Sequence, residues 1–366
     1  MKLYFRFLVV CILAWATVFT VCGQVENEIP SIETWTSQMS RHEGFFTYFW
    51  DQARGKIWLE IPAEKGDFLY VDYLSAGLGS NPVGLDRGRP GGNRIVSFER
   101  IGPKVLLVES NLRFRALSED PLERRAVEDS FAQSVLWGTE VVAESEDRFL
   151  VDWTAFLLRD AHGVIQTLKQ TKQGSYKLDN SRCAVFLPGT EAFPDNSEFE
   201  AVLTFVGEEP GRLVSQMSPD PSAVTLRQHH SFVRLPDDQF QPRRFDPRSG
   251  AIAMTFFDYA SPIGESLAKQ YILRHRLKKK DPSSSLSEPI DPIVYYVDPG
   301  APEPIRSALI EGASWWNEAF EAAGFRDAYR VEVLPPTASP LDVRYNVIQW
   351  VHRSTRGWSY GSSIID

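Results

Sequence analysis

Three short strings in the sequence resemble catalytic signatures, and the first is a partial zinc motif. His42-Glu43 begins like the zinc-binding helix motif His-Glu-x-x-His, but Phe46 stands at the position of the second histidine. Two imidazoles one helical turn apart are needed to hold zinc against one helix face. The string therefore does not predict a metal site.

The other two strings contain a serine. Gly357-Trp-Ser-Tyr-Gly361 fits the nucleophile-elbow pattern Gly-x-Ser-x-Gly, which needs a helix, an aspartate and a histidine downstream. Only Ser362 to Asp366 follow it, so we interpret the match as coincidental. Ser266-Leu-Ala-Lys269 fits Ser-x-x-Lys, but the companion Ser-Asp-Asn and Lys-Thr-Gly boxes are missing.

The histidines do not form a ligand set by their spacing. His229 and His230 are neighbours, and on a strand they would point to opposite faces, so shared chelation is not expected. His162, His275 and His352 do not cluster with Cys, Asp or Glu at metal-ligand spacing. No Gly-x-Gly-x-x-Gly or Walker A string occurs, so no nucleotide cofactor is predicted.

Composition narrows the class of protein. The chain of 366 residues is 43% hydrophobic and 24% charged, which is typical of globular domains and excludes wholesale disorder. Its formal net charge of -9 disfavours a general nucleic-acid binder. We interpret the basic runs at Arg243-Arg244 and over residues 274–280 as solvated faces.

The N-terminus has the order of a secretory signal peptide. Lys2 and Arg6 precede an apolar run over 7–21, and cleavage is expected after Gly23. The protein is then secreted or periplasmic, with no stable membrane span; an uncleaved anchor is the alternative, but the run is short for a bilayer. Cys183 alone remains in the mature chain, so no intramolecular disulfide is expected.

Residues 24–277 are predicted to form a β-rich accessory domain. The alternating run 56–61 and the apolar run 68–74, separated by a turn that contains proline and glycine, indicate antiparallel strands in a sandwich-like or barrel-like body. Residues 149–159 instead keep apolar side chains at helical spacing and predict a helix.

A linker is predicted over residues 278–289, where lysines, serines and prolines gather. The pattern of residues 290–366 then changes to β-α-β-β-β, which makes the whole chain α+β. The strands are expected over 293–297, 329–334, 343–351 and 359–365. The helix is expected to bury one stripe, made of Ile305, Leu309, Gly312, Trp316, Ala319 and Ala323.

Four strings in the C-terminal part are distinctive: Val294-Tyr-Tyr-Val-Asp298, the helix through Trp315-Trp-Asn-Glu-Ala-Phe320, Asp342 to Val351 and Gly357 to Ser363. They resemble the start of the peptidase domain in the large secreted bacterial zinc-dependent metallopeptidases, which are metzincin-like. Gly44-Phe-Phe46 and Lys56 to Pro62 resemble the β-rich domain that precedes the peptidase domain in that family.

The resemblance implies the N-terminal fragment of a secreted zinc-dependent metalloendopeptidase, whose substrate is a protein or peptide. The family's His-Glu-x-x-His helix lies C-terminal to these strands, and this sequence ends at Asp366 before it. We therefore expect a truncated metzincin-like unit with no catalytic residue, no metal ligand and no activity alone; zinc is expected only in the full-length family member. The alternative is a complete non-catalytic secreted module for binding or inhibition. A carbohydrate-binding sandwich, suggested by the ten Trp residues, is a third possibility.

By the same resemblance, the strand that holds Tyr360, Gly361, Ser362 and Ser363 is the candidate cleft edge, where an extended substrate would pair with backbone groups. Without the zinc helix, we expect an exposed apolar patch near the C-terminus that includes Val347 and Trp350 or their neighbours.

Overall fold

The structure is a computed structural model that describes residues 29–355, 359, 361 and 364. The predicted signal segment and its cleavage after Gly23 lie outside the described residues, as does most of the strand predicted over 359–365. In the described part of the chain, no helix has both the length and the apolar character that a bilayer crossing requires.

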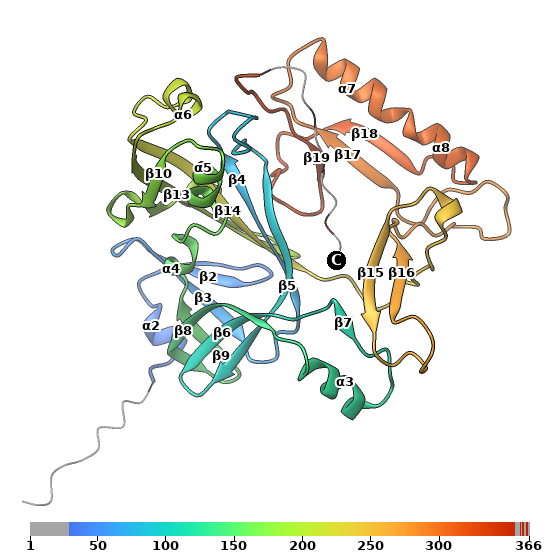
Figure 1. Ribbon diagram of the computed structural model, residues 1–366, viewed down its shortest axis with the longest axis horizontal. Coiled ribbons are helices and arrows are strands. Elements are labelled where there is room, and N and C mark those ends of the chain that lie inside the picture. The colour runs from blue at the N-terminus through green and yellow to red at the C-terminus, as the bar shows by residue number, and fades with distance from the viewer. Residues whose placement is uncertain (1–28, 356–358, 360, 362–363, 365–366) are drawn as a thin grey trace, which may run out of the picture.

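An antiparallel sheet of thirteen strands, the main sheet, forms the body of the molecule and curls nearly into a barrel (Figure 1). This confirms the predicted β-rich antiparallel fold. In spatial order its strands are β1 (Ser40–His42), β2 (Thr47–Asp51), β3 (Lys56–Pro62), β9 (Arg148–Asp152), β8 (Ser134–Ser145), β6 (Lys104–Glu109), β5 (Pro90–Ile101), β4 (Phe68–Ala76), β14 (Ala223–Arg234), β13 (Asn196–Glu208) and β10 (Ser175–Leu178), with the short β11 (Ala184–Val185) and β12 (Glu191–Ala192) also on β13.

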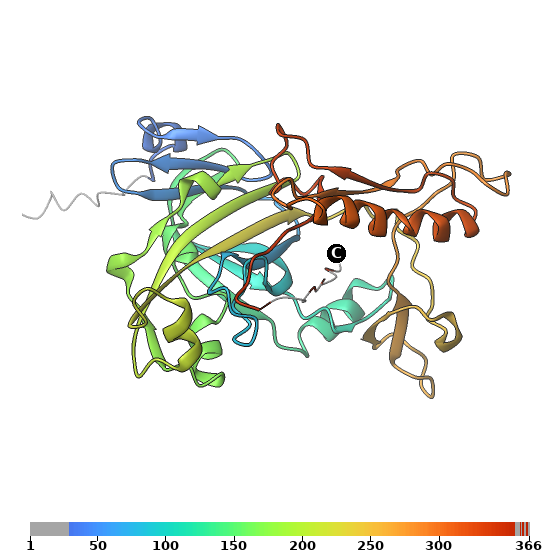
Figure 2. The same ribbon diagram turned by 90° about the horizontal axis from the view of Figure 1, so that it is seen from above.

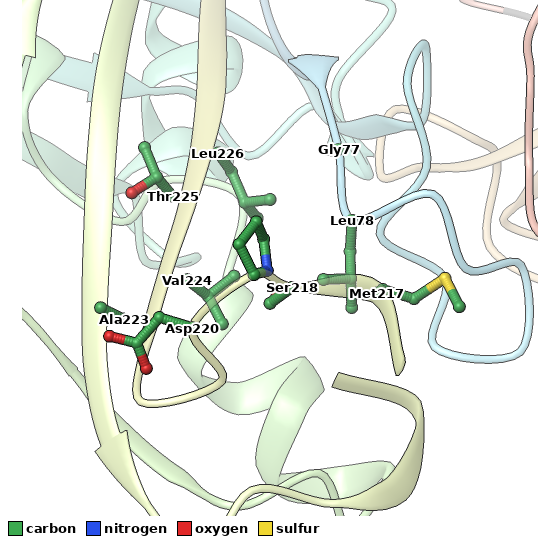
Figure 3. Close-up of a pocket in the computed structure, with 10 residues that line it drawn as sticks. Gly77, Leu78, Met217, Ser218, Asp220, Ala223, Val224, Thr225 and Leu226 are labelled. Carbon is green, nitrogen blue, oxygen red and sulfur yellow. The ribbon is translucent and has the colours of Figure 1, made fainter. Parts of the chain in front are cut away.

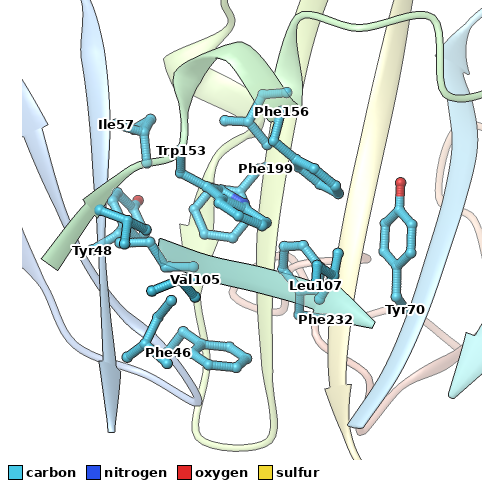
Figure 4. Close-up of a cluster of buried hydrophobic side chains, with 14 of the residues drawn as sticks. Phe46, Tyr48, Ile57, Tyr70, Val105, Leu107, Trp153, Phe156, Phe199 and Phe232 are labelled. Atoms are coloured by element: carbon cyan, nitrogen blue, oxygen red, sulfur yellow. The ribbon is translucent and has the colours of Figure 1, made fainter. Parts of the chain in front are cut away.

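The interior of the curled sheet is the main core. Alternate residues of each strand point inward, and the buried aromatic rings from several strands contact one another edge to face (Figure 4). Burying a side chain of this size contributes roughly 1.5–3 kcal/mol. The largest members are Phe46, Tyr48, Phe68, Tyr70, Trp153, Phe156, Phe199 and Phe232.

Short helices connect the strands of the body. They are α2 (Ile32–Trp35), α3 (Pro121–Glu128), α4 (Thr154–Leu157), α5 (Val164–Gln170) and α6 (Arg212–Met217), with 3-10 turns η1 (Asn180–Arg182), η2 (Leu187–Gly189) and η3 (Pro247–Ser249).

The helix predicted over 149–159 is wrong for its first half, which is strand β9. Phe149 pairs with Ile61 of β3 and packs in the main core, whereas Leu150 points to the other face and packs in a second apolar cluster. A strand buried on both faces has a continuous apolar run, and such a run cannot be told from a buried helix by periodicity. Only Thr154–Leu157 is helical.

A small sheet stands apart from the main sheet. Its strands are β7 (Phe114–Arg115), β15 (Ala253–Asp258) and β16 (Ala268–Ile272), in the order β16-β15-β7. The segment predicted as a linker follows it and forms a closed loop: the Ile290 amide donates to the Lys278 carbonyl at 2.8 Å, and the Lys280 amide donates to Glu288 at 2.9 Å. The domain limits at 24–277, 278–289 and 290–366 stay predictions.

The C-terminal elements form a separate α/β unit (residues 290–355). Their order is β17 (Ile293–Val297), α7 (Ile305–Ser314), α8 (Trp316–Ala322), β18 (Tyr329–Val333) and β19 (Asn346–Ile348). β17 lies between β18 and β19 and is parallel to both. The order strand, helix, strand, strand agrees with the sequence pattern, and the helix is divided in two. Figures 1 and 2 show α7 and α8 along one face of this parallel sheet, beside the main sheet.

The predicted apolar stripe of the helix is wrong in its second half. Trp316, Ala319 and Ala323 are exposed, and Phe320 instead stacks on Tyr329 of β18 with ring centroids 5.8 Å apart. The helix is interrupted at Trp315, which ends α7 and precedes α8, and the interruption turns another face of α8 to the sheet. A stripe drawn at one continuous period cannot follow such a break.

Candidate functional site

Two groups of polar contacts join the α/β unit to the main sheet, and we call them together the junction. The first group lies at the start of β13. Asn196, which is buried, donates from Nδ2 to the Leu341 carbonyl at 2.8 Å and accepts from the Val343 amide at 3.2 Å. Beside it, the Ser339 hydroxyl donates to Glu191 Oε1 at 3.1 Å. One amide side chain thus fixes the turn that leads into β19.

The second group lies beyond β19, against the loop between β4 and β5. Arg353 Nε is 2.8 Å from Asp86 Oδ2, and both side chains are nearly inaccessible to solvent. The Ser354 amide donates to the Gly79 carbonyl at 2.9 Å. Burial raises the pKa of Asp86, and the Arg353 charge counteracts that rise. The segment on either side of β19 is therefore held to the body at both ends.

A buried charged cluster lies directly behind Asn196. His229 has its Nε2 2.7 Å from Glu198 Oε2 and its Nδ1 3.2 Å from Glu200 Oε2. Glu198 also accepts hydrogen bonds from Asn196 Nδ2, at 2.6 Å, and from the Ser231 hydroxyl. A chain of polar contacts therefore runs from His229 through Glu198 and Asn196 to the turn at Leu341.

The two carboxylates set the charge of the imidazole. Burial acts to lower the pKa of His229, but the hydrogen bonds and charges of Glu198 and Glu200 raise it, and the result lies above the ordinary value. Burial acts in the opposite sense on the pKa of Glu200, which His229 and Arg227 hold below its ordinary value. The His229 ring thus lies between two carboxyl groups that favour its charged form, and the Tyr73 ring stacks on it with centroids 4.6 Å apart.

The strand register explains why the charged cluster and the apolar core lie on opposite faces of β13 and β14. On β13, Glu198 and Glu200 alternate with Phe199 and Ala201, so the carboxylates leave the core while the apolar side chains enter it. His229 pairs with Glu200 across to β14. His230 follows on the opposite face and faces the core, as predicted for two neighbouring histidines on a strand.

The inner face carries a polar band between two apolar clusters. His230 Nδ1 is 2.9 Å from the Tyr70 hydroxyl, and Gln228 Nε2 is 2.9 Å from His230 Nε2. Burial, with the nearby Arg159 charge, lowers the pKa of His230 to about 3, so its imidazole is neutral. The apolar clusters on either side contain Phe232 and Leu226 of the same strand.

Asp72 extends this band on β4. Its Oδ2 is 3.0 Å from His162 Nδ1, and its Oδ1 accepts from the Gly92 amide and Arg94. Burial acts to raise the pKa of Asp72, and His162 and Arg94 lower it below its ordinary value. A Cβ on Gly91 would lie 1.9 Å from Asp72 Oδ2, so the close approach of β5 requires glycine there.

Both clusters are enclosed, and neither presents a reactive group to solvent. Glu198, Glu200, His229 and His230 are each at most 4% exposed. In the described residues no three His, Cys, Asp or Glu side chains are placed to hold a metal ion. The arrangement can orient strands and fix the junction, but it offers no nucleophile or open ligand position to a substrate.

Two hollows are found on the surface of the body. One, of about 300 Å³, lies between α6 and the start of β14; Asp220 is its charged side chain, and its other lining residues are apolar or small (Figure 3). The other, of about 420 Å³, is lined by β5 and the end of β6 and includes Arg94 and Glu109. Their lining residues do not bring together a catalytic set.

The residues predicted as the cleft edge cannot be placed as a strand. Tyr360, Ser362 and Ser363 lie outside the described residues, and Gly361 is exposed. Val347 and Trp350, which were named for the predicted apolar patch, are half-buried, so the exposed patch is not found at these residues. Trp315 and Trp316, which lie on the helices and were not part of that prediction, are 66% and 62% exposed.

Sequence reasoning missed the carboxylates and amide that build the junction. Asn196, Glu198 and Glu200 occur at every second position at the start of a strand, with Ser197, Phe199 and Ala201 between and after them. Alternating polar residues on a predicted strand are ordinarily a solvated face, and no feature of the sequence signals that this face is buried. Asp72 stands inside the apolar run 68–74, and a charge inside such a run was a usable signal.

Comparisons with known proteins give one match. The family model of a domain of unknown function, DUF5117, matches residues 88–280, more than half of the chain. The matched region begins before β5 and ends after β16, so it contains β13, β14 and the small sheet. No curated protein and no solved structure matches the chain.

Proposed function

The chain belongs to the DUF5117 family. From the resemblance of its sequence to secreted metallopeptidases and from the pairing of its C-terminal strands, we propose that it is the N-terminal part of a secreted zinc-dependent metalloendopeptidase. In this proposal the β-rich body is the accessory domain and the α/β unit is the upper part of the catalytic domain. The substrate is a protein or peptide.

The observation that carries the proposal is the order and pairing of the C-terminal elements. The family resemblance rests on strings in Val294–Asp298, in the helix and in Asp342–Val351. These strings coincide with β17, with α7 and α8, and with the turn and strand around β19, and the three strands form one parallel sheet. Parallel strands joined through a helix are typical of the core of an α/β enzyme domain.

The exposed side of the α/β unit gives a second line of support. Neither α7 nor α8 has a fully buried residue, and Trp315 and Trp316 expose most of their surface. Two adjacent exposed tryptophans are unusual on the surface of a folded protein, because large apolar side chains are normally covered. We propose that a further element of the catalytic domain packs on these two side chains.

Under the proposal, the body positions the sheet of the catalytic domain. Asn196 holds the chain before β19, and Asp86 holds it after β19 through Arg353. Because both anchors are buried, the strand and its neighbours keep one orientation relative to the body. The described residues offer no ligand set for zinc, so no catalytic step is assigned to residues of this sequence.

The coding DNA beyond the codon for Asp366 tests the proposal without protein. We expect an in-frame His-Glu-x-x-His within about 150 residues, the length of one domain. A stop codon directly after Asp366, with no frameshift, would favour the alternative of a non-catalytic secreted module.

A further inference from the structure

The segment that contains β15 and β16 carries a concentration of positive charge, most of it on the residues before and after these two strands. From residue 241 to residue 280 the sequence has nine Lys and Arg residues and three Asp and Glu residues, while the whole chain has a formal net charge of -9. An acidic protein with one basic region has a local field that attracts anionic partners to that region.

Two stretches of this region lie side by side. Residues 241–245 run antiparallel to the end of β16, since the Phe245 amide donates to the Gln270 carbonyl at 2.9 Å and the Ile272 amide donates to the Arg243 carbonyl at 3.0 Å. Arg274 Nη2 donates to the Gln241 carbonyl. Arg243, Arg244 and Arg274 are thereby gathered at one margin of the small sheet, which we call the basic edge.

The arginines of the basic edge are not neutralised by carboxylates. In the described part of the chain, Arg243, Arg244 and Arg274 take part in no ion pair, whereas the nearby Arg248 and Arg276 pair with Asp246 and Asp237. Arg274 lies over the Phe240 ring at 4.6 Å. Burial and the neighbouring Arg243 charge lower the pKa of Arg274, so an anion placed here would relieve repulsion between like charges.

The backbone at this margin is open for pairing. Arg244 is opposite Tyr271, and the hydrogen bonds to β16 come from the residues on either side of Arg244. In such a pair the amide and carbonyl of Arg244 itself point away from β16. Residues 241–244 are all exposed, and no described residue bonds to these two groups of Arg244.

We propose that the basic edge binds an extended acidic polypeptide segment, which adds as a strand beside residues 242–245 and places its carboxylates against Arg243, Arg244 and Arg274. Backbone pairing with Arg244 supplies the register, and the arginines select acidic side chains. This binding site is separate from the junction and does not depend on the proposed peptidase activity.

The observations favour a polypeptide over a nucleic acid. The Arg274 guanidinium lies over the face of the Phe240 ring, so this face is not free for a base to stack on. The acidic remainder of the chain repels a long polyanion. The positive charges also repel a second copy of the same edge, so the proposal admits acidic segments as partners.

Fluorescence anisotropy with labelled peptides tests the proposal on the purified chain. The probes are a peptide with pairs of adjacent Glu residues between Val residues, so that carboxylates lie on both faces of the strand, the same peptide with Gln for Glu, and the Glu peptide with alternate amide nitrogens methylated. We expect the Glu peptide to bind at least about tenfold more tightly than the Gln peptide. The methylated Glu peptide is expected to lose most of its affinity, because methylation removes the donors that a pairing strand needs.

The variant Arg243→Glu/Arg244→Glu should bind the Glu peptide about tenfold or more weakly than the unaltered chain does. Arg212→Glu is the matched control, because Arg212 is exposed and lies on α6; it should bind as the unaltered chain does. Three results would overturn the proposal: equal binding of the Glu and Gln peptides, unchanged binding by the double variant, and undiminished binding of the methylated peptide. Tighter binding of duplex DNA than of the Glu peptide to the same residues would also contradict it.

Discussion

Arg353 and Asp86 form a buried ion pair across the junction, with 2.8 Å between Nε and Oδ2 and side chains that are 8% and 1% exposed. One residue follows β19 and the other lies in the loop between β4 and β5, so the pair joins the α/β unit to the body. Removing one partner of a buried pair leaves an uncompensated charge, which costs about 3–5 kcal/mol.

The first prediction concerns this pair. Arg353→Met should lower the free energy of unfolding by about 3–5 kcal/mol and should speed amide hydrogen exchange over residues 339–355. Arg306→Met is the control, because the Arg306–Glu303 pair is exposed, and exposed pairs contribute at most about 1 kcal/mol. Equal effects of the two substitutions would show that the junction does not depend on Arg353.

The second prediction is a stability maximum between two titrations of neighbouring histidines. The folded pKa of His229 is raised, so its contribution is complete below the ordinary value of 6.5 and is lost as pH rises through the folded pKa. The folded pKa of His230 is lowered to about 3, so the unfolded state binds the proton first and stability is lost as pH falls below 6.5. Glu200, with its lowered pKa, adds to the loss on the acid side.

Denaturant unfolding at intervals of about half a pH unit from pH 4 to 9 measures the free energy of unfolding on the acid and the alkaline side of the maximum. His229→Gln should flatten the alkaline side of the curve and leave the acid side. His230→Gln should flatten the acid side in part, since Glu200 remains. A His229→Gln curve that runs parallel to that of the unaltered chain would contradict the assignment of a charged imidazole.

The third prediction concerns the close approach of β5 to β4. Gly91→Ala should destabilise the chain by about 1–3 kcal/mol, because the new Cβ would meet Asp72 Oδ2 at 1.9 Å and Asp72 cannot move without losing His162. Gly66→Ala is the matched control, because its Cβ would meet nothing within 4 Å. Thermal unfolding of both variants checks this, and an unchanged midpoint for Gly91→Ala would show that Asp72 is not held in place.

The fourth prediction compares the two faces of α8. Phe320→Ala should cost about 1–3 kcal/mol, since its ring stacks on Tyr329, while Trp316→Ala should change stability by less than about 0.5 kcal/mol. In a longer gene product that contains the proposed covering element, Trp316→Ala should become destabilising as well. A large effect of Trp316→Ala in the present chain would mean that its surface is already covered.

Short alternating or apolar runs between turn residues were enough to predict the β-rich body. The runs 56–61 and 68–74 became β3 and β4, which are buried over most of their length and have turns at their ends. The same reasoning failed at residues 149–152, because the apolar run of β9 continues without a glycine or proline turn into α4. The break at Trp315 was also invisible, because it depends on how α8 packs against β18.

The junction and the charged cluster behind it could be predicted less well than the strands. Asp86, Asn196 and Arg353 of the junction and Glu198 and His229 of the cluster come from loops and strands far apart in the sequence. A buried charge is tolerated only where partners converge on it, and that convergence is a property of the tertiary fold. A single sequence showed these residues only as ordinary polar positions.

Zinc analysis of two purified proteins tests the central claim most directly. One is the chain from Gln24 to Asp366, and the other is the same chain with the residues that its gene encodes beyond Asp366; both are dialysed against a weak chelator and assayed on casein. The account predicts about one equivalent of zinc and chelator-sensitive cleavage for the longer protein, and neither for the chain alone. One equivalent of zinc with chelator-sensitive cleavage in the chain alone, or neither property in the longer protein, would contradict it.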